Sequence, residues 1–246
     1  MQTLIHCIRS DCHKFRHTSM LWIHVLIPFV TAILFLIYFS QSSWKPESEI
    51  SGYFEVIGAS FPLMISLVCS KSIVQEEQAG SFQIMLCGIK SRATVYLSKL
   101  ILLLLMGTLS IALAIGVFAA GFKTAPFPLY VRAAGLLIAG SVFLYILHLF
   151  VSFQYGRGAS IGLGIMESLI SALALTGLGD GKWYYLPCTW SARFCDNLIY
   201  SWLNPTKAFG NAEIQKCLII AIPATIIAFV LSLLWFQNWE GRKSYE

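Results

Sequence analysis

Few residues of this chain have types and spacing that could support chemistry. Glu76 and Glu77 are adjacent carboxylates, and Glu167 lies alone in an apolar stretch. Adjacent carboxylates could act in acid–base chemistry. The spacing of Cys and His matches no metal site. A GxxxxGK[ST] phosphate loop is also missing, because Gly181-Lys182 is followed by Trp183. We therefore expect this chain to have no catalytic residue and to bind no metal or cofactor itself.

The elements that position these residues are long and apolar. The 246 residues are 57% hydrophobic and 12% charged, with a mean hydropathy of +0.71, which leaves too little polar surface for a water-soluble globule. A helix needs about 20 apolar residues to cross a membrane. The runs that meet this need cover about 20–39, 53–74, 100–122, 133–153, 159–179 and 217–236. The sequence therefore predicts an all-α membrane protein, a single domain over 1–246 with six transmembrane helices.

Charges near the ends of these runs favour both termini in the cytoplasm. The inner segments then carry Arg9, Lys14 and Arg92, and most of the opposing cations fall in the long segment 180–216, which the positive-inside rule discounts. The first residues resemble no cleavable signal peptide. Their apolar residues follow helical spacing between basic ones, which predicts an N-terminal helix in the lipid headgroup layer. An ordinary basic flank would have a similar composition.

The loop between the second and third runs carries a periodic apolar pattern. Phe82, Met85, Leu86 and Ile89 are spaced as one stripe of a helix that Ser81 would cap, directly after Gly80. Glu76 and Glu77 precede this cap, where carboxylates stabilise a helix dipole, and Arg92 follows the helix. The pattern predicts a short amphipathic helix with an acidic start and a basic end. A surface helix resting on lipid would show the same periodicity.

The letters of this loop resemble a known family. The string Glu76-Glu77-Gln78-Ala79-Gly80-Ser81-Phe82-Gln83, followed by Met85-Leu86, Ser91-Arg92 and Ser98-Lys99, is similar to the cytoplasmic loop of type-2 ABC exporter permeases. More narrowly, it resembles the permeases that protect bacteria from lantibiotics, as do Trp22-Ile23-His24 and Pro28. One departure is Ile89, because relatives commonly have a proline there.

This resemblance implies a division of labour between subunits. The loop helix would be a coupling helix that docks on a separate ATP-binding cassette ATPase, which would hold ATP and Mg in two copies. A second, related permease subunit would complete the transporter. The residues carried over to ATPase coupling are Glu76, Glu77, Gly80, Ser81, Phe82, Met85, Leu86, Ile89 and Arg92.

The implied function is a permease subunit that expels lantibiotic-type antimicrobial peptides from the bacterial cell membrane, for self-immunity or resistance. Two alternatives stay open: a type-2 exporter of another cargo, and a membrane immunity or sensor protein that works without an ATPase. An intramembrane protease of the Glu-Glu type is disfavoured. That chemistry needs an Arg four residues after the glutamates, where Gly80 and Ser81 stand.

Glu167 and an aromatic outer segment are the candidates for a substrate path or a subunit interface. Glu167 lies near the middle of its run, where a carboxylate costs about 2.5–3.5 kcal/mol. It could face the path, or bond to Ser168, Ser171 or the Ser and His of the fourth run. The outer segment contains Trp183, Tyr184, Tyr185, Trp190 and Trp202. These rings could form a vestibule for an amphipathic peptide or anchor the segment at the outer leaflet, with residues 191–203 as a surface helix. A disulfide between Cys188 and Cys195 is left open.

Overall fold

The computed structural model describes residues 2–16, 18–80, 82–87, 91–204 and 211–242. Every long element in these ranges is an α-helix, as expected for apolar chains that must satisfy their own backbone hydrogen bonds in lipid. The helices are α1 (Gln2–Arg16), α2 (Met20–Gln41), α3 (Pro46–Gln78), α4 (Gln83–Cys87), α5 (Arg92–Gly121), α6 (Phe127–Ala174), α7 (Trp190–Leu203) and α8 (Asn211–Asn238). Short 3-10 turns cover Gly177–Gly179, Trp183–Tyr185 and Pro187–Thr189.

In the described ranges, five helices are long and apolar enough to cross a membrane: α2, α3, α5, α6 and α8. The longest, α6, is not straight. Gly156 has φ 86° and ψ −173°, a left-handed conformation that glycine adopts without strain. A straight helix would hold residues 148 and 167 roughly 28 Å apart, yet His148 Nε2 lies 2.7 Å from Glu167 Oε2. The helix therefore folds back at Gly156 into two antiparallel arms, which match the fourth and fifth predicted runs.

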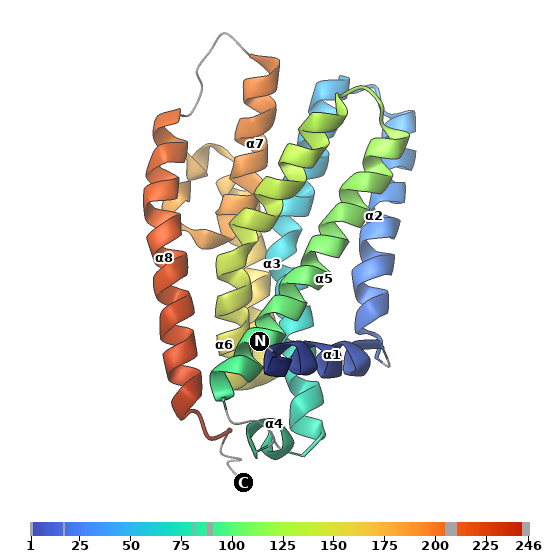
Figure 1. Cartoon of the computed structure of the whole chain (residues 1–246). Coiled ribbons are helices and arrows are strands. Elements are labelled where there is room, and N and C mark those ends of the chain that lie inside the picture. Colours follow the sequence, from blue (N-terminus) through green and yellow to red (C-terminus); the bar gives the residue numbers. More distant parts are fainter. Residues whose placement is uncertain (1, 17, 81, 88–90, 205–210, 243–246) are drawn as a thin grey trace.

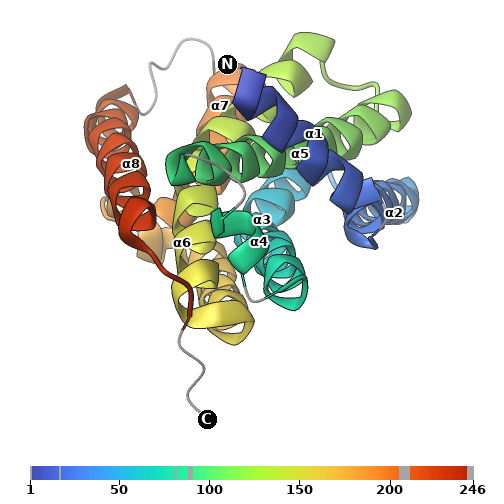
Figure 2. The same ribbon diagram turned by 60° about the horizontal axis from the view of Figure 1, so that its bottom comes forward.

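The two ends of the bundle carry different elements (Figure 1). At one end, called here the α4 end, α1 lies crosswise to the long helices, and α4 lies near the Gly156 turn and the end of α8 (Figure 2). At the opposite α7 end lie the tip of α7 and the connection from α5 to α6. The predicted N-terminal helix thus exists as α1, and its buried face, with Cys7, Asp11 and Phe15, packs at the α4 end.

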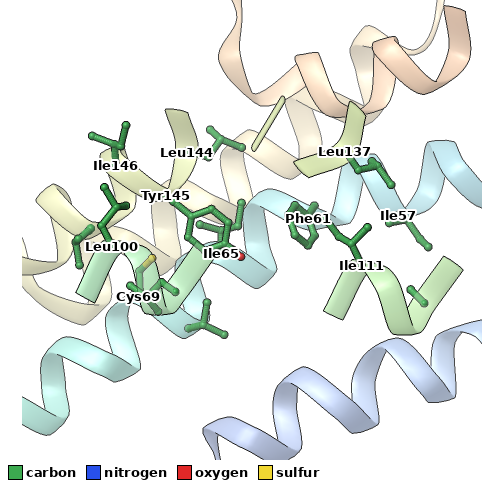
Figure 3. Packing of buried hydrophobic residues seen from close by; sticks show 14 of the residues in the cluster. Ile57, Phe61, Ile65, Cys69, Leu100, Ile111, Leu137, Leu144, Tyr145 and Ile146 are labelled. Atoms are coloured by element: carbon green, nitrogen blue, oxygen red, sulfur yellow. The ribbon is translucent and has the colours of Figure 1, made fainter. Parts of the chain in front are cut away.

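The core lies where α3, α5 and α6 meet. Ile57, Phe61, Ile65 and Cys69 of α3 extend between side chains of α5 and α6 (Figure 3). Helices α3 and α6 bury most of their apolar windows, whereas α2 and α8 leave most of theirs exposed. A helix that is apolar on all sides and exposed on one suits a lipid surround. Helices α3 and α6 therefore form the buried centre of the bundle.

The segment after α6 departs from the predicted surface helix. Helix α7 packs inside the bundle between α3 and α6, and Trp190, Ala192 and Cys195 are almost fully buried. Two glycines allow this close approach: a methyl group on Gly58 would lie 2.5 Å from the Cα of Ala192, and one on Gly140 would lie 2.7 Å from the amide nitrogen of Ser191. The expectation of a helix lying flat on the outer leaflet is wrong, because glycines on α3 and α6 leave a slot that α7 fills with its own small residues Ser191 and Ala192.

The predicted run 159–179 is also too long as a helix. Regular helix ends at Ala174, and the chain continues as 3-10 turns before α7 begins. The second arm of α6 and α7 therefore follow each other along the same side of α3 (Figure 1). Apolar composition alone could not locate this break, because Leu175 and Leu178 continue the hydrophobic run beyond it.

Candidate functional site

The acidic pair of the loop lies at the end of α3, not at the start of the next helix. Both Glu76 and Glu77 fall inside Pro46–Gln78, so they belong to α3 and not to the start of the loop helix, where the sequence pattern placed them. Helix α3 simply extends beyond its apolar run by another turn. Glu76 is 4% exposed, and its Oε1 accepts hydrogen bonds from Lys99 Nζ and Lys14 Nζ, both at 2.8 Å. Its charge is therefore neutralised by two lysines from other helices.

Lys99 is the centre of this charge cluster. Its side chain is 3% exposed and lies 3.2 Å from Asp11 Oδ1 as well as 2.8 Å from Glu76. Ser98 also donates to Asp11 Oδ2 at 3.0 Å. Removing one partner of such a buried set leaves an uncompensated charge and is strongly destabilising. The cluster ties α1, α3 and α5 together at the α4 end, and Asp11 is a member that the sequence did not single out.

The segment from Gly80 to Cys87, called here the coupling segment, turns sharply before a short helix. Gly80 has φ 129° and Phe82 has φ 68°, a left-handed conformation that is unusual for an aromatic residue. Helix α4 then covers only Gln83–Cys87. Ser81 and Ile89, the predicted cap and the last stripe residue, lie outside the described residues.

The predicted apolar stripe points mostly inward. Phe82 is 3% exposed and Met85 is 8% exposed, whereas Leu86 is half-buried. Among the positions of the coupling segment whose side chains the structure describes, Gly80, Gln83 and Cys87 are exposed. The expectation that Phe82 and Met85 form an open docking face is therefore corrected, because the bundle itself supplies an apolar surface that covers them.

That covering surface comes from the turn of α6 and from the end of α8. The Phe82 ring centre lies 5.0 Å from that of Trp239 and 6.2 Å from that of Phe153. The Arg242 guanidinium lies 5.6 Å from the centre of the same Phe82 ring, and Arg242 also pairs with Glu77. Trp239 and Arg242 follow α8 within a few residues, and Phe153 belongs to α6. No local pattern in the loop indicates any of these partners, because all three are distant in sequence.

Arg92 joins the same end of the molecule to α8. It begins α5, and its Nη1 donates to the carbonyl oxygens of Trp239 at 2.9 Å and Gln237 at 3.2 Å. These carbonyls belong to the last turn of α8 and the residue after it, where helical acceptors lack partners of their own. The loop motif thus contacts α1, α3, α5, α6 and the end of α8.

A comparison with protein-family models now identifies the class of protein. The model described as "ABC-2 family transporter protein" matches residues 7–171, about two thirds of the 246 residues. The chain belongs to the ABC-2 transporter family. The match includes α1 from Cys7 onward, the charge cluster, the coupling segment and both arms of α6 as far as Ser171. A search of curated proteins found no match.

Membership confirms the coarser part of the sequence interpretation. This ABC-2 chain is a multi-pass membrane transport subunit whose family implies an ATPase partner. The family match places no requirement on the cargo. Helices α7 and α8 both lie entirely beyond the matched residues, so their roles rest on the structure alone.

Glu167 finds its partner on the neighbouring arm of α6. His148, which is fully buried, contacts Glu167 Oε2 through Nε2 at 2.7 Å and Ser160 Oγ through Nδ1 at 3.1 Å. Counted along the helix, the pair lies roughly 12–16 Å from the Gly156 turn. Of the alternatives left open, the one observed is a carboxylate bonded to the histidine of the fourth run. Glu167 is 8% exposed, so it closes the α6 hairpin from within.

The aromatic outer segment is largely packed rather than open. Trp183, Tyr184 and Trp190 are buried, and Trp183 Nε1 donates to Glu213 Oε2 at 2.8 Å, which fastens the segment to α8. Tyr185 is 64% exposed, and Trp202 is half-buried against the core. The five rings therefore do not share one open face, because α8 covers most of them.

Arg193 is the polar residue that sequence reasoning missed in this segment. Its Nε donates to the carbonyl of Ala174 at 2.8 Å and its Nη2 to that of Thr176 at 3.2 Å, so it caps the end of α6. It also pairs with Asp180 at 2.7 Å and Asp196 at 3.3 Å. The nearby Cys188 and Cys195 are buried free thiols. The link between α6 and α7 is thus held by Arg193 rather than by a disulfide.

Proposed function

We propose that this chain is a permease subunit of an ABC transporter that expels lantibiotic-type antimicrobial peptides from the bacterial cell membrane. The observation that carries this proposal is the coupling segment. It stands at one end of a membrane bundle and is bonded to several of its helices, so a push on α4 would move them together. The amino-acid sequence of this loop resembles that of lantibiotic-protection permeases, and this resemblance supports the choice of cargo.

The fold-back of α6 supports six membrane crossings in our proposed topology. Helices α2, α3, α5 and α8 would each cross once, and the two arms of α6 would add two crossings. An even number returns the chain to the side where it began, and α1 and the end of α8 lie at the same end of the bundle (Figure 1). The clustered cations Lys14, Lys99 and Arg92 favour the cytoplasm for that α4 end.

The proposed ATPase contact uses the outer side of the coupling segment. Gly80, Gln83 and Cys87 are exposed there, and half-buried Leu86 borders them. Phe82 and Met85 would act from inside by passing the movement of α4 to α6 and α8. Two ATPases and a second, related permease subunit would complete the complex, since each ATPase needs a coupling segment to grip.

A substitution test separates docking from folding. Changing both Gln83 and Cys87 to Arg should abolish co-purification of the ATPase and leave the amount of permease in the membrane unchanged. Gln154→Arg, at an exposed position beside the α6 turn, is the matched control. Phe82→Asp is a poor test, because it would also place a charge in a buried aromatic cluster. Normal co-purification by the double variant would remove the proposed docking face.

The cargo is tested in living cells. The permease, its ATPase and its partner permease are expressed in a lantibiotic-sensitive strain, and survival and cell-associated peptide are measured. We expect less bound peptide and better survival with the wild-type ATPase than with one that cannot hydrolyse ATP. Protection that persists without hydrolysis would favour an immunity protein independent of the ATPase. Hydrolysis-dependent transport without protection from any lantibiotic would assign another cargo.

A further inference from the structure

We infer that the residues following α8 form a clasp that positions the coupling segment. The clasp consists of Trp239 and Arg242, which reach back over Phe82 and Glu77. Through the clasp, a movement of the coupling segment is passed to α8 more directly than to any other helix. The term "coupling" rests on the proposed function, whereas the clasp itself is a property of this chain.

Four kinds of contact form the clasp. Trp239 packs edge-on against Phe82 with ring centres 5.0 Å apart. Arg242 lies over the same ring at 5.6 Å, a cation–π contact, and forms an ion pair with Glu77 at the end of α3. Arg92, at the start of α5, donates to the Trp239 carbonyl at 2.9 Å. Trp239 and Arg242 thus contact the coupling segment itself and also the two helices that flank it, α3 and α5.

The turn of α6 provides the base on which the clasp lies. The Phe153 ring lies 5.0 Å from Trp239, and Arg242 fits against Gly156, where no side chain occupies the space. Any residue with a Cβ at position 156 would meet the Arg242 guanidinium, and it would also be strained by the φ of 86°. The left-handed glycine therefore both turns α6 and leaves room for the arginine.

The backbone of the coupling segment shows why a clasp is needed. Phe82 has φ 68°, which costs free energy for a residue with a side chain, and such conformations persist only where surrounding contacts enforce them. Helix α4 is too short to be stable by itself. Trp239 and Arg242 supply contacts that hold Phe82 inward. Without these contacts we expect the coupling segment to sample open conformations. In those conformations α4 no longer contacts the end of α8, so a movement of α4 does not move α8.

Hydrogen exchange of the permease in lipid nanodiscs tests the clasp without any ATPase. In Arg242→Gln, amides of the coupling segment should exchange on the order of three- to ten-fold faster, because an ion pair and a cation–π contact are lost. Arg242→Lys should restore part of the protection by keeping the charge. Glu77→Gln, which removes only the ion pair, should have a smaller effect in the same segment. Arg157→Gln is the matched control, since Arg157 is exposed one residue after the α6 turn.

The pattern of exchange decides the outcome. Faster exchange confined to the coupling segment and to the end of α8 supports the clasp. Unchanged exchange there, or an equal increase throughout α3 and α5, overturns it.

A second readout separates positioning from simple stability. In the assembled transporter, Arg242→Gln should keep ATP hydrolysis near the wild-type rate and lower the cargo moved per ATP hydrolysed. An equal loss of both activities would contradict a positioning role. If the wild-type chain binds no ATPase, the proposed function fails, whereas the exchange result still decides the clasp.

Discussion

The two ends of the bundle hold their short helices by different means. At the α4 end, α1 is held by the charge cluster of Lys99, Glu76 and Asp11. The coupling segment at the same end is held by contacts of the Phe82 ring with Trp239 and Arg242. At the α7 end, α7 is held by close backbone approach at Gly58 and Gly140 and by Arg193 on main-chain carbonyls. One end is fastened mainly by side-chain ion pairs and ring contacts, and the other by packing.

This difference suggests which end moves. Ion pairs and ring contacts are made by side chains, which can adjust their rotamers when a push on α4 shifts the backbone by a small distance. A helix packed against glycine at backbone distance has no such freedom, because any shift opens a void or creates an overlap. We therefore expect the α4 end to rearrange during transport while α7 stays fixed on α3 and α6. The substitutions below test this contrast, starting with the largest expected effect.

Lys99 and Lys14 compare a buried and an exposed cation on the same carboxylate. Lys99→Met should lower the free energy of unfolding by about 3–5 kcal/mol, because it leaves Asp11 and Glu76 buried without their shared cation. Lys14, whose side chain is 36% exposed, should contribute only about 0–1 kcal/mol when changed to Met. Denaturant unfolding in detergent micelles measures both. Equal effects would show that the cluster is looser than its burial indicates.

Arg193 tests the polar brace at the α7 end. Arg193→Met should cost about 3 kcal/mol, since the carbonyls of Ala174 and Thr176 lose their donor inside the bundle. The exposed Asp180 contributes little to this loss of stability, because water screens its ion pair with Arg193. The same unfolding measurement applies, and cysteine accessibility at Cys195 should rise as α7 loosens. A stable variant with Cys195 still protected would mean that packing alone holds α7.

Substitution of two helical glycines compares a position packed against another helix with a position that has free space around it. Gly58→Ala should destabilise the chain by about 1–3 kcal/mol, because its methyl group meets the backbone of Ala192. Gly162→Ala adds the same methyl group where nothing lies within 4 Å, so it should be neutral or stabilise by up to about 1 kcal/mol. Thermal unfolding of the two variants side by side gives the sign of each. Similar shifts would contradict the close packing of α7 on α3.

Glu167 should give the smallest change in stability. Glu167→Gln keeps a hydrogen-bond partner for His148 and should alter the free energy of unfolding by about 1 kcal/mol or less. A role in the substrate path would appear as lost peptide protection in this stable variant. Full protection by Glu167→Leu would instead leave the pair a structural bond of the α6 hairpin. Cell survival and unfolding, measured together, separate these results.

The long helices were predictable because lipid imposes a simple rule on sequence. Uncharged runs near residues 20–39 and 100–122 must be helical to satisfy their backbone, and both lie inside observed helices except for Phe122, which caps the end of α5. The turn at Gly156 was also indicated, by the polar residues that separate the fourth and fifth runs. The short helices were harder. Neither the inward direction of Phe82 nor the buried place of α7 follows from local periodicity, because a stripe shows only that one side is apolar and not what covers it.

The sequence by itself determined the class of this protein: its hydrophobic runs specify a membrane bundle, and the letters of one loop indicate an ABC-2 permease. The tertiary structure decided the partners. It joined Glu76 to Lys99, Glu167 to His148 and Phe82 to Trp239, and it placed α7 inside the bundle. The physical reason is distance along the chain. Hydrophobicity and helix period act over a few turns, whereas ion pairs, ring contacts and close glycine packing form only after distant helices have met.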